Sequence, residues 1–143
     1  VYGNYYIVPQ FGLTQGQCVD ESGREDELTT GMILGPFFMF RKSFLKITGV
    51  FDEQFSCCND YDLAMRFARC GKGIHIPNIL GYYLNEGLGQ STRSDSVQPL
   101  ERTVIELRYN IRVLEPHLIS HIKDYDIENI IVDDVKTLAK EFT

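Results

Sequence analysis

The stretch from residue 49 to residue 71 does most to constrain the fold, because it joins an acidic, aromatic loop to a short amphipathic helix. At about 100° per residue, positions 60 to 70 divide into an apolar arc and a charged arc. Asp62 and Arg66 fall on the charged arc at the spacing of an i,i+4 ion pair, and this side is predicted to face water. The apolar arc consists of Leu63, Ala64, Phe67, Ala68 and Cys70. Because that arc needs a packing partner, the sequence predicts helices packed against a sheet.

Asp60 projects to the middle of the apolar arc, so its carboxylate is predicted to point towards the protein or a crevice. Two roles are open for it. As a helix cap, Asp60 would accept hydrogen bonds from the N–H groups of the first turn. If Asn59 takes the cap instead, Asp60 is free to act as a general base at the mouth of a pocket, where partial burial raises a carboxyl pKa.

The composition is that of one ordinary domain: 143 residues, of which 43% are hydrophobic. Fourteen Lys and Arg against twenty Asp and Glu give a net charge of −6, and there is no basic cluster to follow a phosphate backbone. Nucleic acid is therefore not an expected partner. No apolar run approaches the roughly 20 residues that span a bilayer.

The ends and the cysteines indicate what kind of chain this is. The N-terminus lacks a Met and the pattern of a signal peptide, and it resembles the inside of a strand, so the chain is predicted to be an excised piece of a longer protein. None of the four cysteines has the Cys-x-x-Cys spacing of a zinc or redox motif. They are predicted to be reduced thiols in a cytosolic protein, with Cys70 in the core.

The first half of the chain predicts alternating strands and helices. Residues 5–9 are expected to form a strand, and residues 10–30 either a solvated mobile loop or a lid over the acceptor. The apolar run 32–40 is predicted to be a buried strand, in which Gly35 lets a ligand or another backbone come close. Residues 41–48 read as a short helix that stops at Gly49.

The second half continues with short strands at 74–76 and 80–84, and His75 is expected to be a hydrogen-bonded structural residue. A long helix is predicted from residue 97 to residue 114, with Ser96 as its cap, and a further amphipathic stretch from 127 to 142. A loop at residues 85–96 joins the second of these strands to the long helix. Its Ser91, Thr92 and Arg93 would grip a phosphate, or the loop is an ordinary linker.

Several motifs taken together resemble a known family. They are Phe37-Phe38-Met39-Phe40-Arg41-Lys42, Gly49-x-Phe51-Asp52-Glu53-x-Phe55, Asn59-Asp60-Tyr61-Asp62-Leu63-x-x-Arg66, Gly71 and Ile76-Pro77. In order and spacing they resemble the C-terminal, acceptor-side half of bacterial inverting family 2 glycosyltransferases of the GT-A fold, over about residues 2–94. The resemblance implies an α/β fold, a partial GT-A-like mixed sheet with flanking helices. Residues 1–96 would be the acceptor-side part and residues 97–143 a C-terminal helical extension packed on it.

The resemblance also implies site residues. In the family a Glu-Asp pair carries the catalytic base, and the matching position here is Asp60. Asn59 stands where the family usually has Glu, which removes a neighbouring charge and makes Asn59 the expected cap. Asp52 and Glu53 would shape the acceptor pocket, or they form and cap a turn.

The family further requires a nucleotide-binding half, in which an Asp-x-Asp motif after an apolar strand holds Mg²⁺ or Mn²⁺. The strings Asp60-Tyr61-Asp62 and Asp124-Tyr125-Asp126 do not follow such a strand, so neither is expected to bind metal. The motif would lie upstream of Val1, and this chain alone would be inactive.

The function implied is transfer of a sugar from a nucleotide-sugar donor to a hydroxyl of a glycan or lipid-linked acceptor, in the synthesis of a cell-surface polysaccharide. The location would be the cytoplasm, at the inner face of the membrane if the parent enzyme associates with it peripherally. The alternative from another class is a non-catalytic carbohydrate-binding or interaction domain that uses the same aromatic loop.

Overall fold

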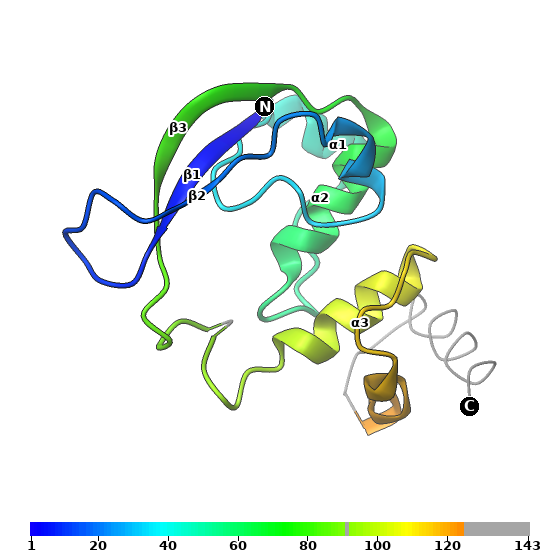
Figure 1. Ribbon diagram of the computed structural model, residues 1–143. Helices are drawn as coiled ribbons and strands as arrows, with labels where there is room; N and C mark the ends of the chain where they lie inside the picture. The colour runs from blue at the N-terminus through cyan, green and yellow to red at the C-terminus, as the bar shows by residue number, and fades with distance from the viewer. Residues whose placement is uncertain (91, 125–143) are drawn as a thin grey trace.

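The computed structural model describes residues 1–90 and 92–124 and shows a mixed α/β fold (Figure 1). Within those residues, one sheet has the strand order β2-β1-β3. Its strands are β1 (Tyr2–Val8), β2 (Gln17–Val19) and β3 (His75–Leu84). The α-helices are α1 (Leu45–Thr48), α2 (Asn59–Cys70) and α3 (Gln98–Arg108). Short 3₁₀ helices cover Glu25–Thr29, Lys42–Phe44 and Pro116–Asp124.

The sheet is mixed, because β1 runs antiparallel to β2 and parallel to β3. Its pairing with β3 shifts register on both sides of Asn4. The Asn4 side chain compensates for this irregularity: its Oδ1 accepts the backbone N–H of Glu21 at 3.1 Å and lies 2.7 Å from His75 Nε2. The prediction that His75 is a hydrogen-bonded structural residue is therefore confirmed.

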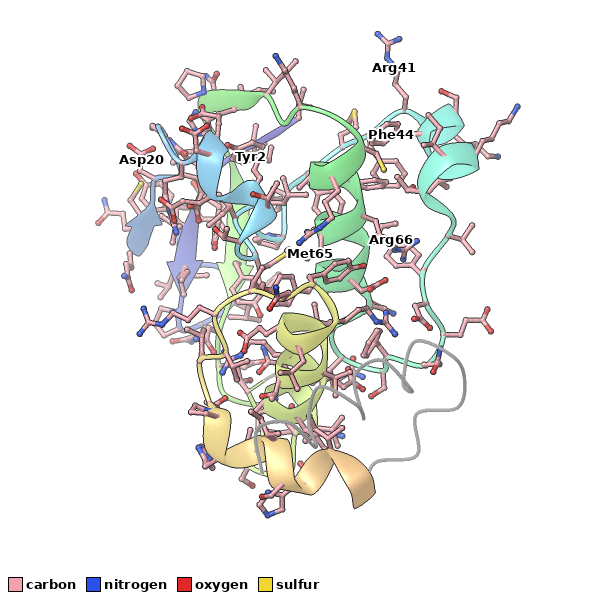
Figure 2. All side chains as sticks on the ribbon, turned by 90° about the vertical axis from the view of Figure 1, so that its right-hand side faces the viewer. Tyr2, Asp20, Arg41, Phe44, Met65 and Arg66 are labelled. Atoms are coloured by element: carbon pink, nitrogen blue, oxygen red, sulfur yellow. The ribbon has the colours of Figure 1, made fainter. Side chains whose placement is uncertain are left out.

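Helix α2 is buried on two sides. Ala64, 3% exposed, packs in a cluster with residues of β1 and the 28–34 segment. Tyr61 and Met65 pack in a second cluster with α3 and the 3₁₀ helix that follows it. Figure 2 shows Met65 and Arg66 leaving α2 on different sides. Met65 is 0% exposed, and burying such a side chain contributes about 1.5–3 kcal/mol.

The prediction of one water-facing side on α2, made of Asp62, Arg66 and Arg69, is therefore wrong in part. Arg69 is exposed, but Arg66 is half-buried and Asp62 is 1% exposed. Cys70 was predicted to lie in the core and is instead exposed at the end of the helix. The helical periodicity of apolar residues indicates one buried face. Helix α2 instead packs between two clusters, so one of its polar residues, Asp62, is buried as well.

The apolar run 32–40 is not a strand, which corrects the prediction. Its pairing is limited to an isolated bridge between Phe38 and Tyr2. Gly35 has a φ of 61°, and Pro36 follows it, so the chain turns where an extended strand would have to continue. Within this run Ile33 and Leu34 are buried in the core, and the ring centre of Phe40 lies 4.6 Å from that of Phe67, whereas Met39 is exposed.

Other local predictions are confirmed with changed boundaries. The first strand begins at Tyr2, three residues before the predicted start. Residues 42–48 are helical and stop at Gly49, whose φ is 77°. Residues 75–84 form one strand where the sequence predicted two, and residues 10–30 contain β2 and a 3₁₀ helix besides loop.

The C-terminal predictions hold in part. Helix α3 ends at Arg108 rather than residue 114, because Asn110 adopts a left-handed φ of 51°. The stretch 127–142 lies outside the described residues.

All four cysteines are free thiols, as predicted. Nowhere in residues 1–90 and 92–124 does a helix have both the length and the hydropathy needed to cross a bilayer.

Candidate functional site

Asp60 is the second residue of α2 and is half-buried. Its Oδ1 accepts the backbone N–H of Tyr61 at 2.7 Å. Burial raises the pKa of the Asp60 carboxyl above its usual range, because desolvation disfavours the charged form, and the hydrogen bonds from backbone N–H groups oppose that rise. Asp60 therefore bonds to a first-turn donor, as the capping prediction requires, and its role as a general base stays a prediction.

The turn that leads into α2 is held by Glu101 of α3. Glu101 is 0% exposed. Its Oε1 accepts the N–H and the hydroxyl of Ser56, both at 2.8 Å, and its Oε2 accepts the N–H groups of Cys57 at 2.7 Å and Cys58 at 2.9 Å. A carboxylate close to a helix N-terminus is also favoured by the helix dipole.

This arrangement corrects the prediction that Asn59 is the helix cap. The N-cap residue is Cys58, whose carbonyl accepts the N–H of Asp62 at 3.0 Å, and it makes no side-chain cap hydrogen bond. Asn59 is instead the first helical residue. Two other carboxylates accept the backbone N–H groups near the helix start: Glu101 accepts that of Cys58, and Asp60 accepts that of Tyr61.

We expect Glu101→Gln to lower the free energy of unfolding by about 1–3 kcal/mol, because an amide replaces a charged acceptor and turns one NH₂ group towards backbone donors. Urea unfolding followed by circular dichroism measures this. Glu53→Gln is the matched control, since Glu53 is exposed and surface changes stay within about 0.5 kcal/mol. Equal unfolding midpoints for the two variants would contradict the role given to Glu101.

The loop at residues 85–96 lies against the same turn. Gln90 Nε2 donates to the Ser56 carbonyl at 2.8 Å, and the Ser96 hydroxyl donates to the Gln90 carbonyl at 2.8 Å. The structure therefore brings together two segments that the sequence proposed separately. Thr92 and Arg93 are on the exposed part of this loop, where Arg93 Nε lies 3.1 Å from Asp95 Oδ1. Ser91 lies outside the described residues.

Asp52 takes the turn-forming role that the sequence left open. Its Oδ1 accepts the N–H of Gln54 at 3.1 Å, and its Oδ2 lies 2.9 Å from Arg108 Nη1. Glu53 is exposed beside it. Asp52 also lines a hollow of about 490 Å³ together with Asp62 and Arg108.

Asp62 forms the centre of a buried ionic network. Its Oδ2 lies 2.6 Å from Arg66 Nη2, so the predicted i,i+4 pair is confirmed although its exposure is not. Its Oδ1 accepts from Arg108 Nη1 at 2.7 Å and from the Tyr109 hydroxyl at 2.8 Å. The Arg108 guanidinium also lies 4.7 Å from the centre of the Phe55 ring. Asp62 Oδ1 thus holds α2 to the end of α3, whereas Oδ2 is taken by Arg66 of α2 itself.

Gly35 is approached by a side chain of the protein itself. A Cβ at this position would lie 2.8 Å from Tyr5 Cε1, and the φ of 61° is one that only glycine adopts easily. Gly35 therefore allows the Tyr5 ring to pack closely against the backbone.

Gly35→Ala is expected to lower the free energy of unfolding by about 1–3 kcal/mol, through the backbone strain and the clash with the ring. Gly87→Ala is the matched control: Gly87 has a φ of 79°, and a Cβ there meets nothing within 4 Å. Thermal unfolding of the two variants separates the clash from the strain. A loss no larger for Gly35→Ala than for Gly87→Ala would show that the contact with Tyr5 is unimportant.

The described residues do not fit a divalent metal site. In residues 1–90 and 92–124, no group of three or more His, Cys, Asp and Glu side chains is placed to hold an ion. The Asp60-Tyr61-Asp62 string is unsuited because Asp62 already pairs with two arginines. The Asp124-Tyr125-Asp126 string lies outside the residues whose side chains are described.

Sequence reasoning missed Glu101, Arg108 and Tyr109. A signal for the first two was present. When α3 is turned by about 100° per residue, Glu101 and Arg108 project between Val104 and Ile105, onto the apolar face. A charged residue at such a position needs a buried partner. The identity of that partner is not visible in the sequence, because Glu101 bonds to residues 43 to 45 positions away.

Comparison with known proteins returned no matching family, no matching curated protein and no matching solved structure. The resemblance to family 2 glycosyltransferases is carried by the motifs of the sequence and stays a prediction.

Proposed function

We propose that this chain is the acceptor-side part of an inverting glycosyltransferase of family 2, with a GT-A-like fold. The observation that carries the proposal is Asp60: a half-buried carboxyl with a raised pKa, placed at the start of α2 within the motif Asn59-Asp60-Tyr61-Asp62. A general base works best when its pKa approaches the working pH, and burial moves Asp60 in that direction. The 85–96 loop beside the same turn supports an acceptor site there.

In the proposed reaction, an acceptor hydroxyl attacks the anomeric carbon of a nucleotide-activated sugar from the face opposite the leaving group. Asp60 takes the hydroxyl proton as the new carbon–oxygen bond forms. The bond to the nucleoside diphosphate breaks, and its electron pair leaves with the diphosphate. The configuration at the anomeric carbon is inverted in this single displacement, and the proton ends on the Asp60 carboxylate.

Glu101 is a positioning residue in this proposal. It fixes the backbone of residues 56–58, and α2 starts directly after them. The orientation of Asp60 therefore depends on α3 as well as on its own helix. Such support from a neighbouring element is needed because small displacements of a reacting group cause large losses in rate.

The donor would be bound by a nucleotide-binding half beyond the described residues, and Mg²⁺ or Mn²⁺ bound there would offset the charge of the leaving diphosphate. The acceptor would be a glycan or a lipid-linked sugar, and the reaction would take place in the cytoplasm, at the inner membrane face if the parent is membrane-associated. The proposed substrate-side residues are Glu53, Asn59, Ser91, Thr92 and Arg93. Gly35 and Asp52, predicted with them from the sequence, are not among them, because the Tyr5 ring packs against Gly35 and Asp52 bonds to Gln54 and Arg108.

The test is a transfer assay with the longer polypeptide that includes the nucleotide-binding half, using a panel of nucleotide sugars and glycan acceptors. Nuclear magnetic resonance of the product reports the anomeric configuration. We expect turnover with inverted configuration. Turnover with retained configuration would refute the single displacement, and glycan binding without any transfer would favour the carbohydrate-binding alternative.

A further inference from the structure

An apolar cavity of about 430 Å³ lies beside the second half of α2. It is separate from the hollow near Asp52, and its α2 lining begins with Ala64, one helical turn after Asp60. Aromatic rings and methyl groups form most of its wall, chiefly Phe38, Phe40, Phe44, Ala64, Phe67 and Ala68.

The size of the cavity is that of a small-molecule site, at the lower end of the usual range of about 300–1,000 Å³. Its rings are fixed by contacts with one another: Phe67 lies 4.6 Å from Phe40 and 5.3 Å from Phe44 between ring centres. The wall is therefore held in place by packing. A cavity of this volume suits one alkyl chain better than the two chains of a membrane phospholipid.

The charges at this cavity all have one sign. Arg41 and Lys72 line it, and none of its lining residues is acidic. Both side chains are exposed, and among the described residues neither makes a hydrogen bond or an ion pair. In Figure 2 the Arg41 side chain extends away from the ribbon next to Phe44. This cationic rim belongs to a protein with a net charge of −6, so it is a local feature rather than an average one.

The apolar surface continues outside the cavity. Met39 and Ile74 line it and are 73% and 62% exposed. Exposed apolar side chains beside a hollow commonly mark a ligand or interaction site. The arrangement is therefore an apolar interior, an apolar lip and a positively charged rim.

We propose that this cavity binds the alkyl chain of a free, single-chain anionic amphiphile of the fatty-carboxylate class. The chain lies between the phenylalanine rings, and the carboxylate lies at Arg41 and Lys72. None of the lining residues belongs to the Asp60 site, so loss of amphiphile binding and loss of transfer are separate outcomes.

The test is isothermal titration calorimetry of the chain with octanoate, decanoate and dodecanoate below their micelle concentrations. We expect one saturable site, with affinity rising about tenfold for each two methylenes added, as alkyl burial predicts. Dodecyltrimethylammonium has the same chain and the opposite charge, and it is expected to bind at least about fivefold more weakly. Equal affinity for the two charges would overturn the proposal.

Three variants test whether dodecanoate binds in this cavity and at its cationic rim. Ala68→Phe fills the cavity and is expected to remove dodecanoate binding while the circular dichroism spectrum is kept. The double variant Arg41→Glu with Lys72→Glu is expected to weaken dodecanoate about tenfold and to strengthen dodecyltrimethylammonium. Lys42→Glu is the matched control, an exposed neighbouring cation that does not line the cavity, and it should change the ratio of the two affinities little.

Unchanged dodecanoate binding in folded Ala68→Phe would overturn the proposal. If Ala68→Phe does not fold, Ala68→Leu fills less space, and the reversal of charge preference in the double variant decides the question alone. A double variant that prefers dodecanoate as strongly as the original chain would refute the role of the rim.

Discussion

Asp60→Asn in the longer, active polypeptide is expected to lower the transfer rate by about 10²–10⁴-fold, the usual contribution of a general base. The amide has nearly the shape of the carboxyl and its oxygen still accepts the N–H of Tyr61. It cannot take the proton of an acceptor hydroxyl. Steady-state kinetics measures kcat, and calorimetry with the nucleotide sugar should show donor affinity nearly unchanged.

The pH dependence of transfer by the unaltered sequence checks the same assignment. The pKa of Asp60 is raised by burial, so the rate is expected to fall as the pH drops through a value above that of an ordinary aspartate. Asp26→Asn is the matched control, because Asp26 is exposed in the 3₁₀ helix Glu25–Thr29, outside both the turn before α2 and the 85–96 loop. Normal turnover in Asp60→Asn, or an equal loss in Asp26→Asn, would remove Asp60 from the role of base.

The stability of Asp60→Asn shows whether a loss of activity comes from the missing base or from unfolding. Because the folded pKa of Asp60 lies above the unfolded one, its ionised form opposes folding once the pH exceeds the folded pKa. Asp60→Asn removes that penalty. Its unfolding midpoint at neutral pH should equal or exceed that of the original chain, and this advantage should disappear below the unfolded pKa.

Asp62→Ala is expected to lower the free energy of unfolding by about 3–5 kcal/mol, because it leaves buried positive charge without a partner. Arg108, with a side chain 7% exposed, would keep Asp52 alone, and Arg66 would lose its ion pair. The Tyr109 hydroxyl would lose its carboxylate acceptor at 2.8 Å and keep the backbone carbonyl of residue 62 at 3.4 Å. Urea unfolding measures the loss.

Asp95→Ala is the matched control for the loss of unfolding free energy in Asp62→Ala. It also removes an aspartate that pairs with an arginine, but Arg93 and Asp95 are 53% and 78% exposed. Exposed pairs contribute at most about 1 kcal/mol. If Asp62→Ala and Asp95→Ala have similar unfolding midpoints, the network around Asp62 does not hold α2 to α3.

Local patterns predicted the elements well where neighbours in sequence decide the conformation. The spacing of apolar residues located α2, and Gly49 ended the preceding helix as predicted. Predictions from local patterns were wrong where contacts with residues distant in sequence determine burial or capping. The burial of Asp62 depends on Arg108, 46 positions away, and the start of α2 depends on Glu101 rather than on Asn59.

The candidate site was predicted to the same extent. The helical projection of Asp60 indicated a carboxyl turned inwards, and the structure has it half-buried with a raised pKa. The sequence did not show that the 85–96 loop meets the turn before α2, because that contact depends on Gln90, a residue without a distinctive pattern. For the run 32–40, composition indicated burial correctly for Ile33 and Leu34 but not for Met39, which is 73% exposed, and it did not indicate the conformation, since Gly35 and Pro36 turn the chain.

The contacts of α3 also limit how a gene for this protein can recombine. Glu101 and Arg108 come from beyond residue 96, but their acceptors and donors lie in the turn before α2 and on α2 itself. A crossover between residues 66 and 101 that imported a tail without a matching acid and guanidinium would leave the backbone donors of residues 56–58 without Glu101 and would leave Asp62 with Arg66 as its one arginine. The two segments are therefore expected to be inherited together, and a chimera should fold well only when both come from one parent.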